Sequence, residues 1–407
     1  MMKRAIVLSL LSFLVVMISQ AQIMNFYKNI KQLAEFWLSF AEIPLAHSLG
    51  NSQNLTLKIL DMATLWKKVI AIGLLCLAIG AGCQNATAQG ENSLETFESF
   101  ADWCLNQDRL TPEARHTVEV LLARAGTQDC PQADAILTHL TELTLIGNHI
   151  TDVAPLDALT SLTELDLRQN RIADVTPLAN LTELTRLDLS QNHIVDVAPL
   201  SSLTNLTWLM LASNQIVDVA PLANLTHLGW LFLGDNQIVD VAPLASLTNL
   251  KTLSLGNNQI AEVAPLASLT NVDGLWLQGN QIADISPLTT MTGLSLLYVA
   301  DNQITEVASL ANLTNLNELW LNHNQIADVA PLASLTRLIK LDLSHNQIVD
   351  VAPLANLTYM TQLSLRDNQI VDASPLANLA YLSELELRDN PLENHTCPVP
   401  NASLCAF

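Results

Sequence analysis

Aromatic residues recur at a fixed interval in the second half of this sequence. Trp208 and Trp230 are 22 residues apart, and Trp276, Tyr298 and Trp320 follow one another at the same interval. If each interval forms one structural unit, the rings lie in a row that binds apolar protein surface or stacks on sugar rings. We predict a ligand-binding face made of Trp208, Met210, Trp230, Phe232, Trp276, Leu296, Tyr298 and Trp320.

Charged residues flank this aromatic row on both sides. The predicted rim consists of Asp166, Arg168, Arg186, Asp188, Lys340, Asp342, Arg366 and Arg388. An apolar centre within a charged rim is typical of protein-binding surfaces. The alternative is that aromatic residues merely suit strands and that this patch packs on the N-terminal cap or on a second copy of the chain. Strand preference does not explain why the equivalent positions of the first three and last three repeats hold no aromatic residue.

Four residues at the same interval form a smaller group, Asp301, His323, His345 and Asp367. Such a group would suit a transition metal or a response to pH, and the simpler alternative is a set of solvated turn residues, which we favour. The sequence has no Gly-rich phosphate loop and no HExxH or GxSxG motif. We therefore expect no enzymatic activity, no cofactor and no metal.

A 22-residue repeat positions all of these side chains. It covers residues 137–390, and each of about 12 copies follows Leu-Thr-x-Leu-x-x-Leu-x-Leu-x-x-Asn-x-Ile-x-Asp-Val-Ala-Pro-Leu-Ala-x. Leu-x-Leu alternates as a strand does, so the sixth and eighth residues of each copy point away from the buried leucines. Leu-x-x-Leu-x-Leu-x-x-Asn within a period of roughly 20–29 residues is typical of leucine-rich repeats, which bury their apolar face only by stacking.

Two polar positions of the repeat have structural explanations. Asn stands at the twelfth position of every copy, from Asn148 to Asn390, and a buried amide must be hydrogen-bonded, so we expect a ladder between copies. Asp at the sixteenth position, as in Asp174, precedes Val-Ala-Pro-Leu or a close variant and would cap a short helical turn that begins with Pro. A calcium ladder is the alternative, but its Gly-Gly-x-Gly-x-Asp motif is absent.

The ends of the array need to be covered. Residues 89–136 are predicted to form a helical N-terminal cap, with one helix that begins at Thr111-Pro112 and ends at Gly126, and with Phe97, Phe100 and Trp103 on a preceding helical stretch. Residues 391–407 are predicted to form the C-terminal cap.

Four cysteines stand at the two ends of the array and none within a repeat. Four cysteines of an exported protein permit three pairings, and we expect Cys104 with Cys130 and Cys397 with Cys405. A zinc site is the competing interpretation, but the full length of the repeat array separates the two pairs and neither pair has CxxC spacing.

The N-terminal segment indicates export. Residues 62–88 have the basic, apolar and small-residue regions of a signal peptide, and residues 1–61 are interpreted as an upstream or signal-like segment that is not necessarily translated. An N-terminal membrane anchor and a lipid anchor at Cys83 are the alternatives. Every one of these readings predicts a secreted, periplasmic or cell-surface protein.

Charge restricts the partners. Residues 1–88 hold 7 of the 18 Lys and Arg and 3 of the 39 Asp and Glu, so residues 89–407 keep 11 basic and 36 acidic side chains, a net charge of −25. Phosphate backbones and anionic lipid surfaces repel such a body, so we expect neither nucleic acid nor a membrane surface as partner.

Copies such as that of residues 225–244 resemble the internalin-type leucine-rich repeats of bacterial surface proteins, and the similar repeats of a eukaryotic phosphatase-1 regulatory subunit. The segment from Phe100 to Cys130 resembles the cap of exported cyanobacterial repeat proteins. The resemblance implies an α/β solenoid: a curved horseshoe with a parallel β-sheet on the concave face, short 3₁₀ turns on the convex face and a helical N-terminal cap. It implies a non-enzymatic protein that grips another macromolecule, a protein or alternatively a glycan, and a structural envelope protein is the third possibility. The given sequence shows no immunoglobulin-like module or wall-anchoring tail after the repeats, unlike internalins, so we do not expect a role in host-cell invasion.

Overall fold

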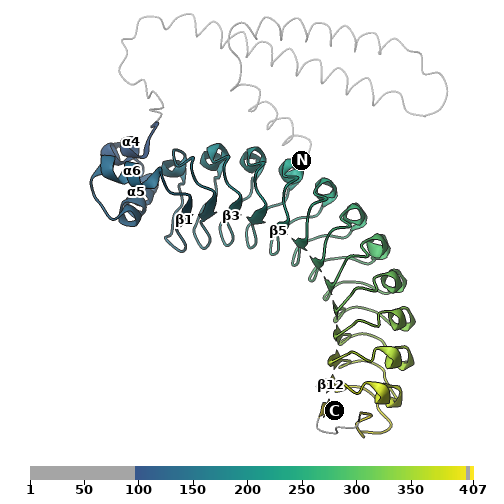
Figure 1. Cartoon of the computed structure of the whole chain (residues 1–407). Coiled ribbons are helices and arrows are strands. Elements are labelled where there is room, and N and C mark those ends of the chain that lie inside the picture. The colour runs from purple at the N-terminus through teal and green to yellow at the C-terminus, as the bar shows by residue number, and fades with distance from the viewer. Residues whose placement is uncertain (1–96, 400–403) are drawn as a thin grey trace, which may run out of the picture. The chain divides into compact units, whose positions relative to one another are not determined.

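The computed structural model describes residues 97–399 and 404–407, which form one curved stack of repeats (Figure 1). Every strand of the described chain belongs to a single parallel sheet, in which consecutive repeats supply neighbouring strands. The strands line the inner side of the arc and the short helical turns its outer side (Figure 1). This confirms the predicted solenoid. The predicted segments 1–61 and 62–88, with the lipid-anchor alternative at Cys83, lie outside the described residues.

Each repeat contributes one three-residue strand, and a two-residue strand follows the last repeat. The strands are β1 Glu142–Thr144, β2 Glu164–Asp166, β3 Arg186–Asp188, β4 Trp208–Met210, β5 Trp230–Phe232, β6 Thr252–Ser254, β7 Gly274–Trp276, β8 Leu296–Tyr298, β9 Glu318–Trp320, β10 Lys340–Asp342, β11 Gln362–Ser364, β12 Glu384–Glu386 and β13 Cys405–Ala406. The register pairs equivalent positions of neighbouring repeats, for example Trp208 with Trp230 and Trp276 with Tyr298. Each column of the repeat therefore becomes a row of side chains across the sheet.

The core of each repeat is a set of aliphatic side chains with almost no exposed surface. In the copy at residues 159–180 the predicted inward residues are at most 2% exposed: Leu162, Leu165, Leu167, Ile172, Val175 and Leu178. Burying a side chain of this size contributes roughly 1.5–3 kcal/mol as an upper bound. Since the central leucine of each repeat's strand lies beside the central leucine of the neighbouring repeat, a repeat closes its core only against its neighbours.

The convex side consists of 3₁₀ turns, as the recurring Pro predicts. They are η2 Ala154–Leu156, η3 Thr176–Asn180, η4 Ala198–Ser202, η5 Ala220–Asn224, η6 Ala242–Ser246, η7 Ala264–Ser268, η8 Ser286–Thr290, η9 Ala308–Asn312, η10 Ala330–Ser334, η11 Ala352–Asn356 and η12 Ser374–Asn378. The carboxylate of Asp174 accepts the N–H of Thr176, the first residue of its turn, at 2.8 Å. Every Asp at the sixteenth position of a repeat accepts the equivalent N–H. Glu262 and Glu306, at the same position, have a longer side chain and accept no such bond.

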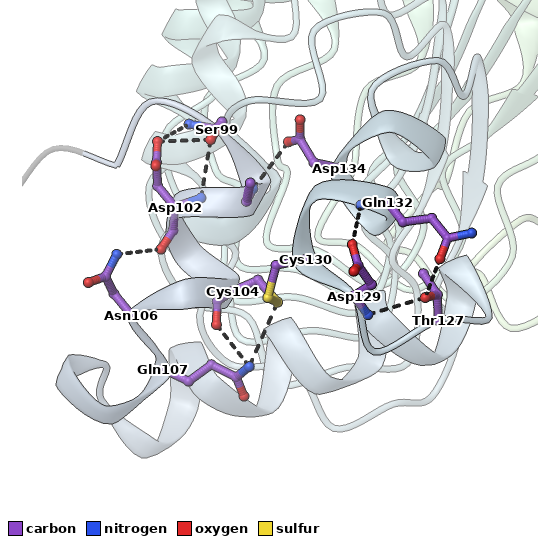
Figure 2. The surroundings of a disulfide bond; sticks show 11 residues. Ser99, Asp102, Cys104, Asn106, Gln107, Thr127, Asp129, Cys130, Gln132 and Asp134 are labelled. Atoms are coloured by element: carbon purple, nitrogen blue, oxygen red, sulfur yellow. Dashed lines mark hydrogen bonds between the residues drawn. A yellow bond between two sulfur atoms is a disulfide. The ribbon is translucent and has the colours of Figure 1, made fainter.

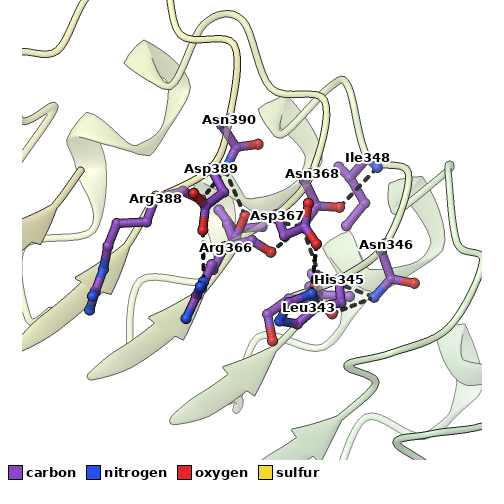
Figure 3. Close-up of polar contacts among 12 residues, drawn as sticks. Leu343, His345, Asn346, Ile348, Arg366, Asp367, Asn368, Arg388, Asp389 and Asn390 are labelled. Carbon is purple, nitrogen blue, oxygen red and sulfur yellow. Dashed lines mark hydrogen bonds and ion pairs between the residues drawn. The ribbon is translucent and has the colours of Figure 1, made fainter.

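The asparagine ladder ties each repeat to the one before it. Asn368 accepts the N–H of Ile348 in the preceding repeat at 3.0 Å (Figure 3). Its Nδ2 donates at 3.0 Å to the carbonyl of Leu343 in the preceding repeat and, at the same distance, to that of Leu365 in its own. The same bonds recur from Asn170 to Asn390, so the amide replaces backbone partners that neither repeat supplies by itself.

Three helices and a 3₁₀ turn cover the first repeat. They are α4 Phe100–Leu105, η1 Gln107–Arg109, α5 Pro112–Ala125 and α6 Cys130–Leu137. As predicted, Thr111 caps α5 by accepting the N–H of Ala114, and Gly126 ends the helix in the left-handed region. Helix α4 begins later than the sequence suggested: Ser99 and Asp102 form a capping box, so Phe97 lies before the helix. Helix α6, which begins at Cys130 and runs to the first repeat, was not predicted.

Each end of the array carries a disulfide. Cys104 of α4 is bonded to Cys130 of α6, with 5.5 Å between their Cα atoms, and Gln107 donates a hydrogen bond to the carbonyl of Cys104 (Figure 2). Cys397 is bonded to Cys405, which lies in β13 beside β12. These are the pairs expected from the sequence. The added strand β13 was not expected, and it covers the edge that β12 would otherwise expose.

Replacing one asparagine within the ladder should destabilise the solenoid far more than replacing the first. Asn280→Ala leaves the Ile260 N–H and the Leu255 and Leu277 carbonyls without their side-chain partner, so the free energy of unfolding should fall by at least about 2 kcal/mol. Asn148→Ala is the matched control, because Asn148 has no preceding repeat and its amide donates only to the Ile146 carbonyl. Urea unfolding measures both variants, and equal losses would contradict the ladder's role.

Candidate functional site

The eight predicted ligand-binding residues all lie on the concave face of the sheet. They stand at the first or third position of a strand, on either side of a buried central leucine. Trp230 is the most open of the tryptophans in the repeats, at 44% exposed, and the other seven predicted residues are half-buried. No residue of the described chain covers this face as a separate layer, since every strand belongs to the one sheet and the helices lie at its N-terminal end and on the opposite side (Figure 1).

The aromatic residues form two clusters and not one continuous patch. The N-terminal aromatic cluster lies on β4 and β5 and consists of Trp208, Met210, Trp230 and Phe232. The C-terminal aromatic cluster lies on β7 to β9 and consists of Trp276, Leu296, Tyr298 and Trp320. Between them β6 presents Thr252 and Ser254, whose small polar side chains leave a gap in the apolar row.

The rings of the C-terminal aromatic cluster are stacked. The centroids of Trp276 and Tyr298 are 5.5 Å apart with planes 14° from parallel, and those of Tyr298 and Trp320 are 5.4 Å apart at 11°. In the N-terminal aromatic cluster, Trp208 and Phe232 are 6.1 Å apart and tilted by 58°. Stacking covers the faces that the three rings share, so this cluster offers ring edges and its two terminal faces.

Gly274 makes room for the first ring of the stack. A Cβ at Gly274 would lie 2.7 Å from two carbons of the Trp276 ring, which real atoms do not approach. Gly274 is the only glycine in the sixth column of the repeat, directly before the Leu that precedes Trp276. A glycine at this position is therefore a signal in the sequence for where the Trp276 ring lies.

A chain of hydrogen bonds continues from the stack into the C-terminal rim. The hydroxyl of Tyr298 donates to Glu318 at 2.8 Å, and the ammonium of Lys340 lies 3.0 Å from the other oxygen of that carboxylate. Burial, followed by the bond to Glu318, raises the pKa of Tyr298 to about 12. Burial raises the pKa of Glu318 too, but the hydrogen bonds from Lys340 and Tyr298 outweigh it and hold that pKa below its usual value. Lys340, predicted as a rim residue, is thus already paired within the chain.

The N-terminal rim residues surround a hollow of about 240 Å³, which Trp208 also lines. The guanidinium of Arg186 lies over the Trp208 ring, 4.8 Å from its centroid. Arg168 lies 3.4 Å from Asp166 and 3.8 Å from Asp188. Burial, with the neighbouring charge of Asp188 as a smaller cause, raises the pKa of Asp166. Asp188 is itself buried, at 4% exposed, and its carboxylate accepts hydrogen bonds from the hydroxyl and the N–H of Ser190. It is therefore not an exposed rim residue.

Two of the C-terminal rim residues, Lys340 and Asp342, border a second hollow of about 250 Å³, which we call the C-terminal hollow. Its lining residues are Trp320, Lys340, Leu341, Asp342, Gln362, Leu363, Ser364, Glu384 and Glu386. The two predicted arginines do not line it and are paired within the chain. Arg366 pairs with Asp389 at 2.9 Å (Figure 3). Arg388 binds Glu386 through two nitrogens.

The Asp and His residues of the eleventh column occupy a strained turn position. Asp301, His323, His345 and Asp367 all have a positive φ, between 52° and 54°, as does the same column in the other repeats. Asp, Asn and His tolerate this left-handed conformation better than most residues, which accounts for their presence. The rings of His323 and His345 are stacked, with centroids 4.0 Å apart. His345 bonds to Asp367 at 2.7 Å (Figure 3). In residues 97–399 and 404–407 no group of three or more potential ligands is arranged around a metal position.

Comparisons with known proteins agree with this architecture. A family profile described as Leucine Rich repeats (2 copies) matches residues 138–180, 182–224, 226–268, 294–334, 314–356 and 336–378. An internalin (inlF) from Listeria monocytogenes is 34% identical with a TM-score of 0.61, over 71% of this chain and 92% of its own.

More distant structures share the fold alone. The functional domain of InlJ from Listeria monocytogenes is 24% identical with a TM-score of 0.59, over 72% of this chain and 61% of its own. The Arabidopsis receptor kinase HAESA, solved with the peptide hormone IDA and the co-receptor SERK1, is 24% identical with a TM-score of 0.55, over 62% of this chain and 46% of its own. No curated protein sequence matches. Within the part of the chain that the structure describes, no helix combines the length and the apolar character needed to span a membrane.

Tyr298 should keep its proton until about pH 12. Its pKa is about 12 in the folded chain against an ordinary value of 10.0, so the unfolded chain ionises first. The contribution of Tyr298 to stability is therefore intact below pH 10 and is lost as the pH rises to about 12. The difference in ultraviolet absorbance between the wild type and Tyr298→Phe gives the midpoint, with circular dichroism as the check on folding. Glu318→Gln should lower that midpoint, and an unchanged midpoint would refute the contribution assigned to Glu318.

Proposed function

Because this chain belongs to the leucine-rich repeat family, as a bacterial protein of the internalin type, we propose that it is a non-enzymatic protein that binds another protein on its concave face. A leucine-rich repeat solenoid is a fold typical of protein-binding domains. The observation that carries the proposal is the placement of six aromatic rings on one open side of the sheet, within β4 to β9. Neighbouring strands are about 4.8 Å apart, so these rings extend over roughly 24 Å.

The ring arrangement supports a protein ligand over a glycan. Sugars bind aromatic residues through the ring faces, whereas the inner faces of the Trp276, Tyr298 and Trp320 stack are covered by one another. The exposed edges, together with Trp230 and Met210, suit the apolar side chains of a protein. A glycan therefore has few open faces along this part of the sheet.

Charge and disulfides support the proposed partner and compartment. The net charge of −25 on residues 89–407 repels nucleic acid and favours a partner with basic groups. The disulfides at both ends are typical of oxidising compartments. We accordingly place the protein outside the cytoplasm, as a secreted, periplasmic or cell-surface protein.

Alanine at the four concave tryptophans should abolish capture of the partner while the protein stays folded. The variant combines Trp208→Ala, Trp230→Ala, Trp276→Ala and Trp320→Ala, because partly exposed rings of this size dominate interface energies. The immobilised full chain is incubated with extracellular protein, and mass spectrometry compares what the wild type and the variant retain. Circular dichroism and urea unfolding establish that the variant is folded.

Tyr359 and Tyr381 provide the matched control. They are 66% and 68% exposed, are the two aromatic residues of the repeats outside the sixth and eighth columns, and contribute nothing to the concave strands. The double variant Tyr359→Ala with Tyr381→Ala should capture the same protein as the wild type. Retention of that protein by the quadruple tryptophan variant would count against the concave face, and the absence of any saturable ligand would favour a structural envelope protein.

A further inference from the structure

The C-terminal hollow is a polar pocket with one aromatic wall. Tyr298 covers one face of the Trp320 ring, and the residues that line the hollow with Trp320 come from β10 to β12, on the side away from Tyr298. The second face of Trp320 therefore borders the hollow. Its volume of about 250 Å³ is enough for the end of one long side chain.

At the N-terminal end of the concave face, a tryptophan ring that borders a hollow already binds a cationic side chain of the chain itself. In the hollow that the N-terminal rim residues surround, the guanidinium of Arg186 lies 4.8 Å from the centroid of the Trp208 ring and 3.8 Å from the carboxylate of Glu164. A guanidinium is attracted both by the face of an indole ring and by a carboxylate. No cation of the described repeats lies on the Trp320 ring, so the face of Trp320 that borders the hollow has no equivalent cover.

The charges around the C-terminal hollow are unevenly matched. Lys340 is directed to Glu318, and Glu386 binds Arg388, so these two pairs are satisfied. Asp342 accepts hydrogen bonds from Ser344 through one oxygen, and Glu384 accepts one from Gln362 at 3.1 Å. Neither Asp342 nor Glu384 has a cationic partner. Two carboxylates thus border the hollow without a positive charge to neutralise them.

We propose that the C-terminal hollow takes an arginine side chain of the protein partner, stacked on the free face of Trp320 and paired with Asp342 and Glu384. The proposal rests on the protein-binding function above and deepens it by naming the chemistry of one contact. Arginine fits better than lysine because a planar guanidinium stacks on an indole ring and has enough donors for two carboxylates, whereas an ammonium is a point charge. Arg186 over Trp208 is the same arrangement made within the chain.

Fluorine NMR of the full chain labelled with 5-fluorotryptophan tests the proposal without a partner. The probe is Nα-acetyl-arginine amide, and the matched control is Nα-acetyl-citrulline amide, which has nearly the same shape and no charge. The Trp320 signal, assigned from Trp320→Phe, should move saturably with the arginine compound and not with citrulline. The Trp208 signal should not move, because Arg186 already covers that ring, and Arg186→Ala should make it respond.

Two substitutions separate charge from structure. Asp342→Asn and Glu384→Gln keep the oxygens that bind Ser344 and Gln362, so the fold is retained, but together they should weaken the arginine response by about ten-fold or more. An equal response to citrulline, or full affinity in the double variant, overturns the proposal. A lysine compound that binds as well as arginine, or a methyl glucoside that moves the Trp320 signal in place of arginine, also overturns it. Since the probe requires no captured protein, failure here is distinct from failure of the concave face to bind a partner.

Discussion

The buried asparagine amide is the interaction on which this solenoid depends. An amide without partners in an apolar interior is costly, and each one from Asn170 onward finds partners only when the preceding repeat lies one strand away in step. The ladder therefore does more than join neighbours. It fixes the register of the parallel sheet, so that residue n always lies beside residue n + 22.

Because the register is fixed, equivalent positions of successive repeats lie side by side and form a continuous surface. Positions that do not pack in the core vary from repeat to repeat. At the sixth and eighth positions, the middle repeats of the array carry large rings and the repeats at both ends carry charged side chains. The strand spacing then decides how the rings meet. Trp276, Tyr298 and Trp320 are close enough to stack, which orders them before any ligand arrives and reduces the entropy that binding costs.

The ends of the array follow from the same constraint. A repeat without a neighbour exposes apolar side chains and unpaired backbone groups. A different element covers these groups at each end of the array. At the N-terminal end His116 and Thr117 of α5 bind the carbonyls of Asn148 and Asp152, in place of a preceding repeat. At the C-terminal end β13 pairs with β12 and the disulfide Cys397–Cys405 fastens it. The concave face between the two ends is left open to a partner.

The sequence by itself determined the solenoid, its concave sheet, its 3₁₀ turns and the columns that reach the open face, because the 22-residue period makes every such feature a local pattern seen twelve times. It also indicated the cap helix from Thr111 to Gly126, whose signals are adjacent in the chain. Only the tertiary structure decided what depends on contacts between repeats: the stacking of Trp276, Tyr298 and Trp320, the burial of Asp188 and the pairing of Lys340 with Glu318. These contacts depend on the rotamer that each side chain adopts against a side chain in a neighbouring repeat. Helix α6 and strand β13 also depend on tertiary contacts, because they pack against the two ends of the array.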